Sequence, residues 1–138
     1  MPVVDSDIPY IEQAEIELDA VASEPAWQEA LVVDDFLTFA PSFDQAPTGT
    51  TVARVLADAR GLWFHFTTTD PEPDKIRAGL GRRDTRFQDD WVAVYVDPAG
   101  EGQRAYLFLV TPLGVQADGV NVSGADESTA WDLSLIHI

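Results

Sequence analysis

The chain has 138 residues, 46% of them hydrophobic, and a formal net charge of −16 at pH 7. This length suits one domain with its own core, and the composition is that of a globular rather than a disordered protein. The acidic surface repels phosphate backbones and anionic membranes, and no window approaches the roughly 18 apolar residues that span a bilayer. We therefore expect a neutral or cationic partner and no nucleic acid.

The first thirty residues are predicted to form an extended lead-in, an edge strand and a short helix. Residues 1–14 are acidic and weakly patterned, and they lack the basic and apolar run of a signal peptide. Apolar and acidic side chains alternate over residues 16–20, which indicates an edge strand. Ser23 can cap a helix that has Pro25 in its first turn, and this helix would turn Trp27 toward the core.

A hairpin is predicted in the middle of the chain. A first strand over 31–39, interrupted by two acids, precedes two strand-like runs over 50–57 and 62–68. The runs are joined by 58–61, where Gly61 can adopt a positive φ. Both faces of 62–68 are largely apolar, which predicts a central strand that is covered on both sides.

The second half of the chain is organised around residues 82–97. A basic loop leads into Phe87 and two acids, and side chains then alternate from Trp91 onward, which predicts a buried strand. A short helical segment over 74–80 precedes this stretch, and further strands are expected over 103–111 and 115–122. Six or seven short strands with almost no helix predict an all-β protein, either a sandwich or a barrel.

The last six residues, 133–138, break the pattern. They are similar to the translated end of an adapter used in preparing sequencing libraries, so we expect an artefactual tail and a domain that is truncated after about Asp132. The alternative is a natural final strand, because the composition of this segment is strand-like. A sandwich that lacks its last strands would leave an open edge.

The order of several motifs resembles the family 9 carbohydrate-binding module, and especially the family-9-like domains that precede a bacterial outer-membrane β-barrel. The resemblance covers residues 16–131 and gives a domain over 15–132. It is carried by Glu24-Pro25-Ala26-Trp27, the hairpin 52–66, Asp70-Pro71, the strand 89–97, and residues 106–118. It implies an antiparallel β-sandwich of jelly-roll or immunoglobulin-like kind that binds xylan- or cellulose-type polysaccharide. It also implies an extracellular, periplasmic or outer-membrane-associated setting.

The resemblance also implies a contact surface. Phe87 occupies the place of one of the two aromatic rings that grip the sugar, because an aromatic face packs on the apolar face of a pyranose. Arg86, Asp89 and Asp90 surround it, and Trp131 lies just before the segment that would supply the second ring. Two polar clamps of the family are missing, because Ala93 stands in place of a Glu and Leu109 in place of an Arg.

Each of these residues also has a structural interpretation. Phe87 could anchor its loop in the core, as most phenylalanines do. Asp89 and Asp90 could hold a structural Ca²⁺, with Asp70 and Glu101 as helpers, or could pair with the nearby cations Arg82, Arg83 and Arg86. Trp27, Trp63 and Trp91 lie on amphipathic elements and are interpreted as core residues.

No catalytic apparatus is visible in the sequence. His65 alternates with core residues and is interpreted as an interior group, and the chain has no cysteine and no nucleophile or zinc motif. We therefore expect a non-catalytic carbohydrate-binding-like module that belongs to a larger polypeptide. Two alternatives remain open, namely an interaction or plug-like domain that packs on a neighbouring β-barrel without binding sugar, and a targeting module of a glycoside hydrolase.

Overall fold

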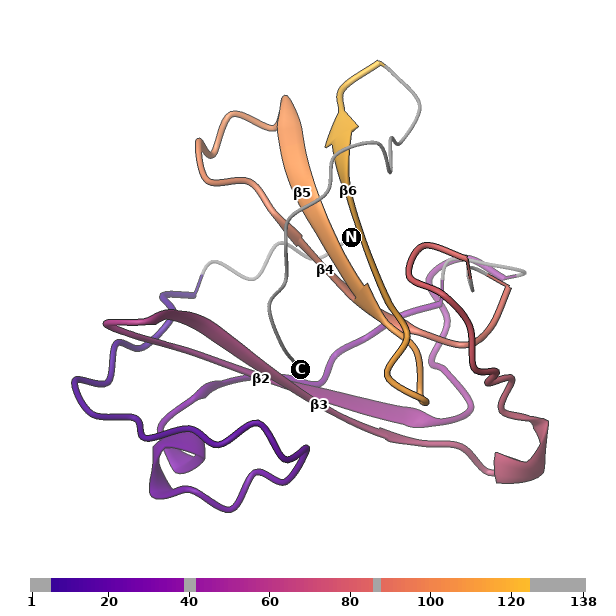
Figure 1. Ribbon diagram of the computed structural model, residues 1–138, viewed down its shortest axis with the longest axis horizontal. Helices are drawn as coiled ribbons and strands as arrows, with labels where there is room; N and C mark the ends of the chain where they lie inside the picture. Colours follow the sequence, from indigo (N-terminus) through magenta and orange to yellow (C-terminus); the bar gives the residue numbers. More distant parts are fainter. Residues whose placement is uncertain (1–5, 39–41, 86–87, 125–138) are drawn as a thin grey trace. The chain divides into compact units, whose positions relative to one another are not determined.

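A computed structural model describes residues 6–38, 42–85 and 88–124 (Figure 1). Its regular elements are two antiparallel three-stranded sheets and two short 3₁₀ turns, which confirms the predicted all-β class with the strand content of a small β-sandwich-like fold. The chain divides into two compact units, residues 1–73 and 74–138, and each unit contains one sheet. None of the helices in the described part is long and apolar enough to cross a membrane.

The sheet of the first unit has the strand order β1-β2-β3, with β1 at Leu31–Val33, β2 at Thr50–Asp58 and β3 at Gly61–Thr69. The predicted hairpin is confirmed, because β2 and β3 pair in continuous register from Thr50 opposite Thr69 to Asp58 opposite Gly61. Gly61 has a φ of 147°, which only glycine adopts without strain. Of the strand predicted over 31–39, the described residues 31–38 form a strand only in the first three.

The core of this unit lies against one face of β2. Leu56 is fully buried and packs with Ala14, Ile16, Ala26 and Trp27. Trp27 reaches the core from a 3₁₀ turn, η1 (Pro25–Gln28), whose first residue is the proline, as expected. The N-cap is Glu24 and makes no side-chain capping bond, so the assignment of Ser23 as the cap was wrong by one residue.

The strand predicted over 16–20 was wrong. Glu15 and Ala20 have φ values of 48° and 65°, which end an extended chain. The Glu24 carboxylate accepts a hydrogen bond from the Glu17 N–H at 2.6 Å, and the Asp19 carboxylate accepts one from the Val21 N–H at 2.8 Å. Acidic side chains thus bind backbone N–H groups that a strand would use for pairing, and the segment forms a loop. The alternation of apolar residues in the sequence does not reveal these side-chain bonds.

The position predicted for β3 was also wrong. The central strand is β2, and β3 lies at the end of the sheet. Leu62 and Phe64 of β3 are 45% and 36% exposed, so one face of this strand is only partly covered. An apolar pattern on both faces shows which side chains gain from burial, but it does not reveal the order of strands in a sheet.

The hairpin turn holds a buried carboxylate. The side chain of Asp58 is 5% exposed, and it accepts hydrogen bonds from the backbone N–H of Arg60 at 2.8 Å and of Gly61 at 3.2 Å. The Arg60 guanidinium contacts Asp58 at 2.9 Å and lies 4.5 Å from the centre of the Trp63 ring. Burial raises the pKa of Asp58, but the Trp63 indole N–H and Arg60 outweigh it and lower this pKa to about 2.

We expect the substitution Asp58→Asn to lower the melting temperature by several degrees at neutral pH. The folded-state pKa of Asp58 lies below its ordinary value of 3.8, so the stability that ionised Asp58 contributes is complete above that value and is lost as the pH falls toward about 2. Circular-dichroism melts of both proteins should therefore converge in acid. A constant difference from neutral pH to pH about 2, or an equal effect of the exposed-site control Asp35→Asn, would contradict this role.

The short turn η2 (Pro73–Lys75) spans the boundary between the two units. The second unit contains the sheet β4-β5-β6, with β4 at Val92–Val96, β5 at Arg104–Val110 and β6 at Gln116–Val122. These three strands lie within the ranges expected from the sequence. Buried Leu107, Leu109 and Ala117 pack with Ala93 on one face of the sheet. The helical segment expected over 74–80 is confined to the single turn η2.

Two loops of this sheet are fixed by side-chain oxygens. After β4, the Asp97 carboxylate accepts hydrogen bonds from the N–H groups of Gly102 at 2.7 Å, Ala99 at 3.1 Å and Gly100 at 3.0 Å. The bond from Gly102 is the main reason that the pKa of Asp97 is lowered. After β5, Thr111 Oγ1 accepts a hydrogen bond from the Val115 N–H at 3.1 Å.

Candidate functional site

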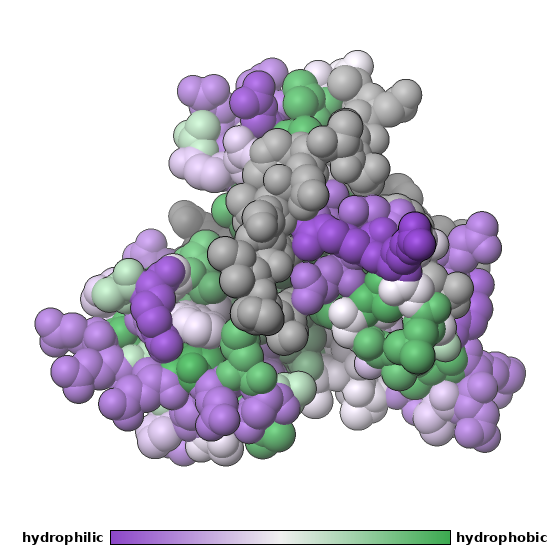
Figure 2. All heavy atoms as spheres, viewed as in Figure 1, coloured by the Kyte–Doolittle hydropathy of each residue, from purple (hydrophilic) through white to green (hydrophobic). Residues whose placement is uncertain are grey.

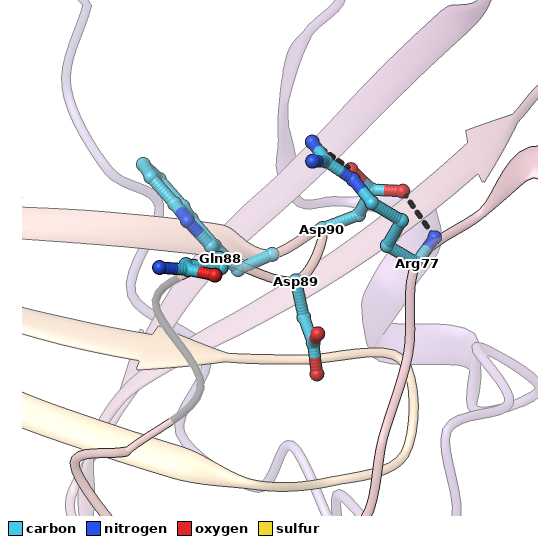
Figure 3. Close-up of a pocket in the computed structure, with 5 residues that line it drawn as sticks. Arg77, Gln88, Asp89 and Asp90 are labelled. Carbon is cyan, nitrogen blue, oxygen red and sulfur yellow. Dashed lines mark hydrogen bonds and ion pairs between the residues drawn. The ribbon is translucent and has the colours of Figure 1, made fainter.

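The second unit has an open pocket of about 450 Å³ at the start of β4. It is lined by Arg77, Gln88, Asp89, Asp90 and Trp91, and Figure 3 shows the side chains around it. An amide, two carboxylates, a guanidinium and an indole therefore share one small concave surface. All of the lining residues except Arg77 belong to the stretch 82–97, around which the second half of the chain was expected to be organised.

Backbone bonds join the two segments that form the pocket. The Asp90 N–H donates to the Arg77 carbonyl at 2.8 Å, and the Arg77 N–H donates to the Asp90 carboxylate at 2.8 Å. The Arg77 guanidinium also lies 3.8 Å from this carboxylate. Asp90 is thus fixed by main-chain contacts, which hold a side chain more rigidly than an exposed ion pair does.

Asp89 is anchored separately. Its carboxylate accepts a hydrogen bond from the Gly79 N–H at 2.9 Å. In Figure 3 the carboxylate of Asp90 turns toward Arg77, whereas that of Asp89 points away from it. The two adjacent acids therefore present oxygens in different directions, which suits a ligand with several hydroxyl groups better than a single point charge.

Trp91 is 48% exposed and lines the pocket, so its interpretation as a core residue was wrong. The period-two argument placed it in line with Ala93, which does pack in the core. However, β4 begins at Val92, so Trp91 precedes the first paired residue and lies outside the ladder. Trp27 is 6% exposed, as expected, and Trp63 packs against the same core.

The structure brings together only part of the predicted site. Asp89 and Asp90 line the pocket, while Phe87, Arg86 and Trp131 lie outside the described residues. Arg77, Gln88 and Trp91 were missed as contact residues. Trp91 could have been found from its place between two acids and the first strand residue, but the contact of Arg77 depends on chain folding that the sequence does not display.

Among the described residues, Asp90 forms an ion pair that was not expected, while the expected partner Arg86 lies outside these residues. Asp90 pairs with Arg77 rather than with Arg83, and Arg83 contacts Asp118 and lies 3.7 Å from Asp84. Asp118 is 1% exposed, so Arg83, one of the cations expected to pair with the two acids, instead contacts a buried carboxylate on β6. The basic loop is thereby attached to the sheet.

Among the described residues, no group of three or more His, Cys, Asp or Glu side chains is placed to hold a metal ion. Calcium takes six to eight oxygen ligands, and the structure places Asp89 and Asp90 with carboxylates that point apart. A structural Ca²⁺ at Asp89 and Asp90 therefore stays a prediction.

His65 lies in the first unit and is not part of the pocket. Its Nε2 lies 3.3 Å from the Ala20 carbonyl, and its ring centre is 5.5 Å from that of Trp27. These contacts fit a residue that fastens the loop over the core.

The pocket has the chemistry of a binding site for a neutral polar ligand. Trp91 offers an apolar face, and the surrounding groups include both hydrogen-bond donors and acceptors. Comparisons with family models, with curated proteins and with solved structures find no match for this chain.

Proposed function

We propose that this chain is a non-catalytic carbohydrate-binding-like module and that the pocket around Trp91 is its contact surface. The observation that supports the proposal most strongly is the 48% exposure of an indole in a pocket that it shares with Asp89, Asp90, Gln88 and Arg77. A half-exposed tryptophan is a large apolar surface left in water, and a sugar ring could cover it. The resemblance to family 9 carbohydrate-binding modules points in the same direction.

The polar groups around Trp91 favour a sugar over other flat ligands. Carboxylates accept hydrogen bonds, a guanidinium only donates them, and an amide does both, so the rim matches hydroxyl groups that also do both. The charge of −16 disfavours phosphorylated and other anionic ligands. A neutral polysaccharide of the xylan or cellulose type satisfies both conditions.

This proposal moves the aromatic platform from Phe87 to Trp91. Trp91 is four positions further along the chain and precedes the same strand, β4. Asp89 and Asp90 keep the role expected from the sequence, which is to bond hydroxyl groups at the rim. Arg77 takes over as the cation of the site in place of Arg86.

Titration with xylohexaose and with cellohexaose, followed by tryptophan fluorescence, tests the proposal. We expect a saturable change, and we expect Trp91→Ala to weaken binding about tenfold or more, because it removes the burial of the indole together with aromatic packing worth about 0.5–1.5 kcal/mol beyond that burial. Tyr10→Ala is the matched control, because Tyr10 is a 63%-exposed aromatic residue of the first unit. Phe87→Ala decides between the two candidate rings.

The proposal fails if saturating amounts of both sugars leave the fluorescence unchanged. It also fails in its assignment of the platform if Trp91→Ala binds like the wild type while Phe87→Ala does not bind. In that case the sugar site would follow the family resemblance and not the pocket.

A further inference from the structure

The outer edge of β3 is a long row of unpaired backbone groups. In an antiparallel ladder, every second residue bonds the neighbouring strand and the others face away from it. Ala57, the partner of Leu62, uses its N–H and C=O on Pro9 and Ile11 and not on β3. The residues of β3 whose backbone faces outward are therefore Leu62, Phe64, Phe66 and Thr68.

The opposite side of the same sheet is already occupied. β1 pairs with β2 over Ala53–Val55, and Ile11 and Pro9 bond Ala57 further along, with Tyr10 forming a parallel bridge. Among the described residues no backbone partner lies along the outer edge of β3. This sheet can thus be extended on one side only.

β3 lacks the features that protect an edge strand. It is nine residues long, pairs with β2 without a bulge, and contains no Pro, Lys, Arg, Asp or Glu. The backbone N–H and C=O groups of Leu62 and Phe64 point away from β2, and these residues are 45% and 36% exposed. Hydrophobic side chains reach the surface among hydrophilic ones in the view of Figure 2. A long, uncharged edge strand of this kind is a template for another strand.

The charge of the first unit indicates which strand would fit. Residues 1–73 contain fourteen Asp or Glu and two Lys or Arg. A second copy of the chain would bring the same negative charge, so self-association through β3 is opposed by repulsion. A cationic segment is attracted to this unit, and apolar residues at every second position would contact Leu62, Phe64 and Phe66.

We propose that the edge of β3 binds an extended segment of a partner protein that is cationic and apolar at alternate positions. The segment adds a fourth strand to the sheet β1-β2-β3 by bonding the outward groups of Leu62, Phe64, Phe66 and Thr68. This interaction surface lies in the first unit, whereas the proposed sugar pocket lies in the second.

Two synthetic nine-residue peptides with blocked ends serve as probes, one alternating Val with Lys and the other alternating Val with Glu. Amide hydrogen exchange of the intact chain gives the readout. With the Lys peptide we expect exchange at Leu62, Phe64, Phe66 and Thr68 to slow by about tenfold or more, while amides of β4 to β6 keep their rates. The Glu peptide should give no protection.

Thr68→Pro removes one outward N–H without touching the bonds to β2, and Thr68→Ala is its matched control. We expect the proline variant to lose the protection and the alanine variant to keep it. Equal protection by both peptides would overturn the cationic character of the partner, and a lack of protection with both peptides would overturn the edge as a binding surface. A concentration-dependent dimer with these four amides protected in the absence of peptide would show that a second copy is the occupant.

Discussion

Leu56→Ala should lower the free energy of unfolding by about 2–5 kcal/mol, the usual range for truncating a fully buried leucine. Leu56 is 0% exposed at the centre of the first unit, where it packs with Trp27 and Ile16. The loss has two parts, namely the transfer energy of the deleted methyl groups and the cavity that remains. Denaturant unfolding measures it as a fall in the midpoint at constant slope.

Val32→Ala is the matched control for this substitution. Val32 lies on β1 of the same sheet, but it is 50% exposed, so its truncation should cost well under about 1 kcal/mol. If both variants lose the same stability, the core of the first unit is not where the structure places it.

Arg83→Met should lower the free energy of unfolding by about 3 kcal/mol, the lower end of the range for breaking a buried ion pair. Asp118 is 1% exposed on β6, and Arg83 brings its guanidinium to this carboxylate. The side chain of Arg83 is 28% exposed, so water screens part of the interaction and the lower end applies. Without the guanidinium, the Asp118 carboxylate loses this cationic contact while it remains buried.

Arg82→Met tests whether the effect belongs to this pair, because Arg82 is the neighbouring exposed cation. The double variant Arg83→Met with Asp118→Leu should regain part of the lost stability, since it removes the buried charge together with its partner. Equal losses for Arg82→Met and Arg83→Met, or no recovery in the double variant, would contradict the role of the pair.

The strands and the hairpin could be predicted because their signals are local. The signals for the strands over 92–96, 104–110 and 116–122 and for the turn before Gly61 depend on neighbours in sequence, and the structure confirms the positions of these elements. The order of the strands depends on distant contacts, and so β3 was placed at the centre instead of the edge. The loop over 16–20 failed for a related reason, because the Glu24 carboxylate reaches back to the Glu17 backbone and removes the strand.

The site could be predicted only where its residues are adjacent. Asp89 and Asp90 stand together before a strand, so their presence at its start was visible. Arg77 joins them because its backbone forms hydrogen bonds with the backbone and the carboxylate of Asp90, thirteen residues away in sequence. The periodicity of the sequence cannot predict such a contact. Trp91 was misassigned because a strand boundary one residue further along changes a side chain from buried to exposed.

The most direct test of the proposed sugar site is a nitrogen-edited proton spectrum of the intact, ¹⁵N-labelled chain during titration with xylohexaose and cellohexaose. The four tryptophans give separate indole N–H signals, which substitution of each by Phe assigns. We predict that the Trp91 signal shifts in a saturable manner while those of the core residues Trp27 and Trp63 stay in place. If all four signals stay in place at saturating sugar, or if only Trp27 and Trp63 respond, the pocket at Trp91 is not a carbohydrate-binding site.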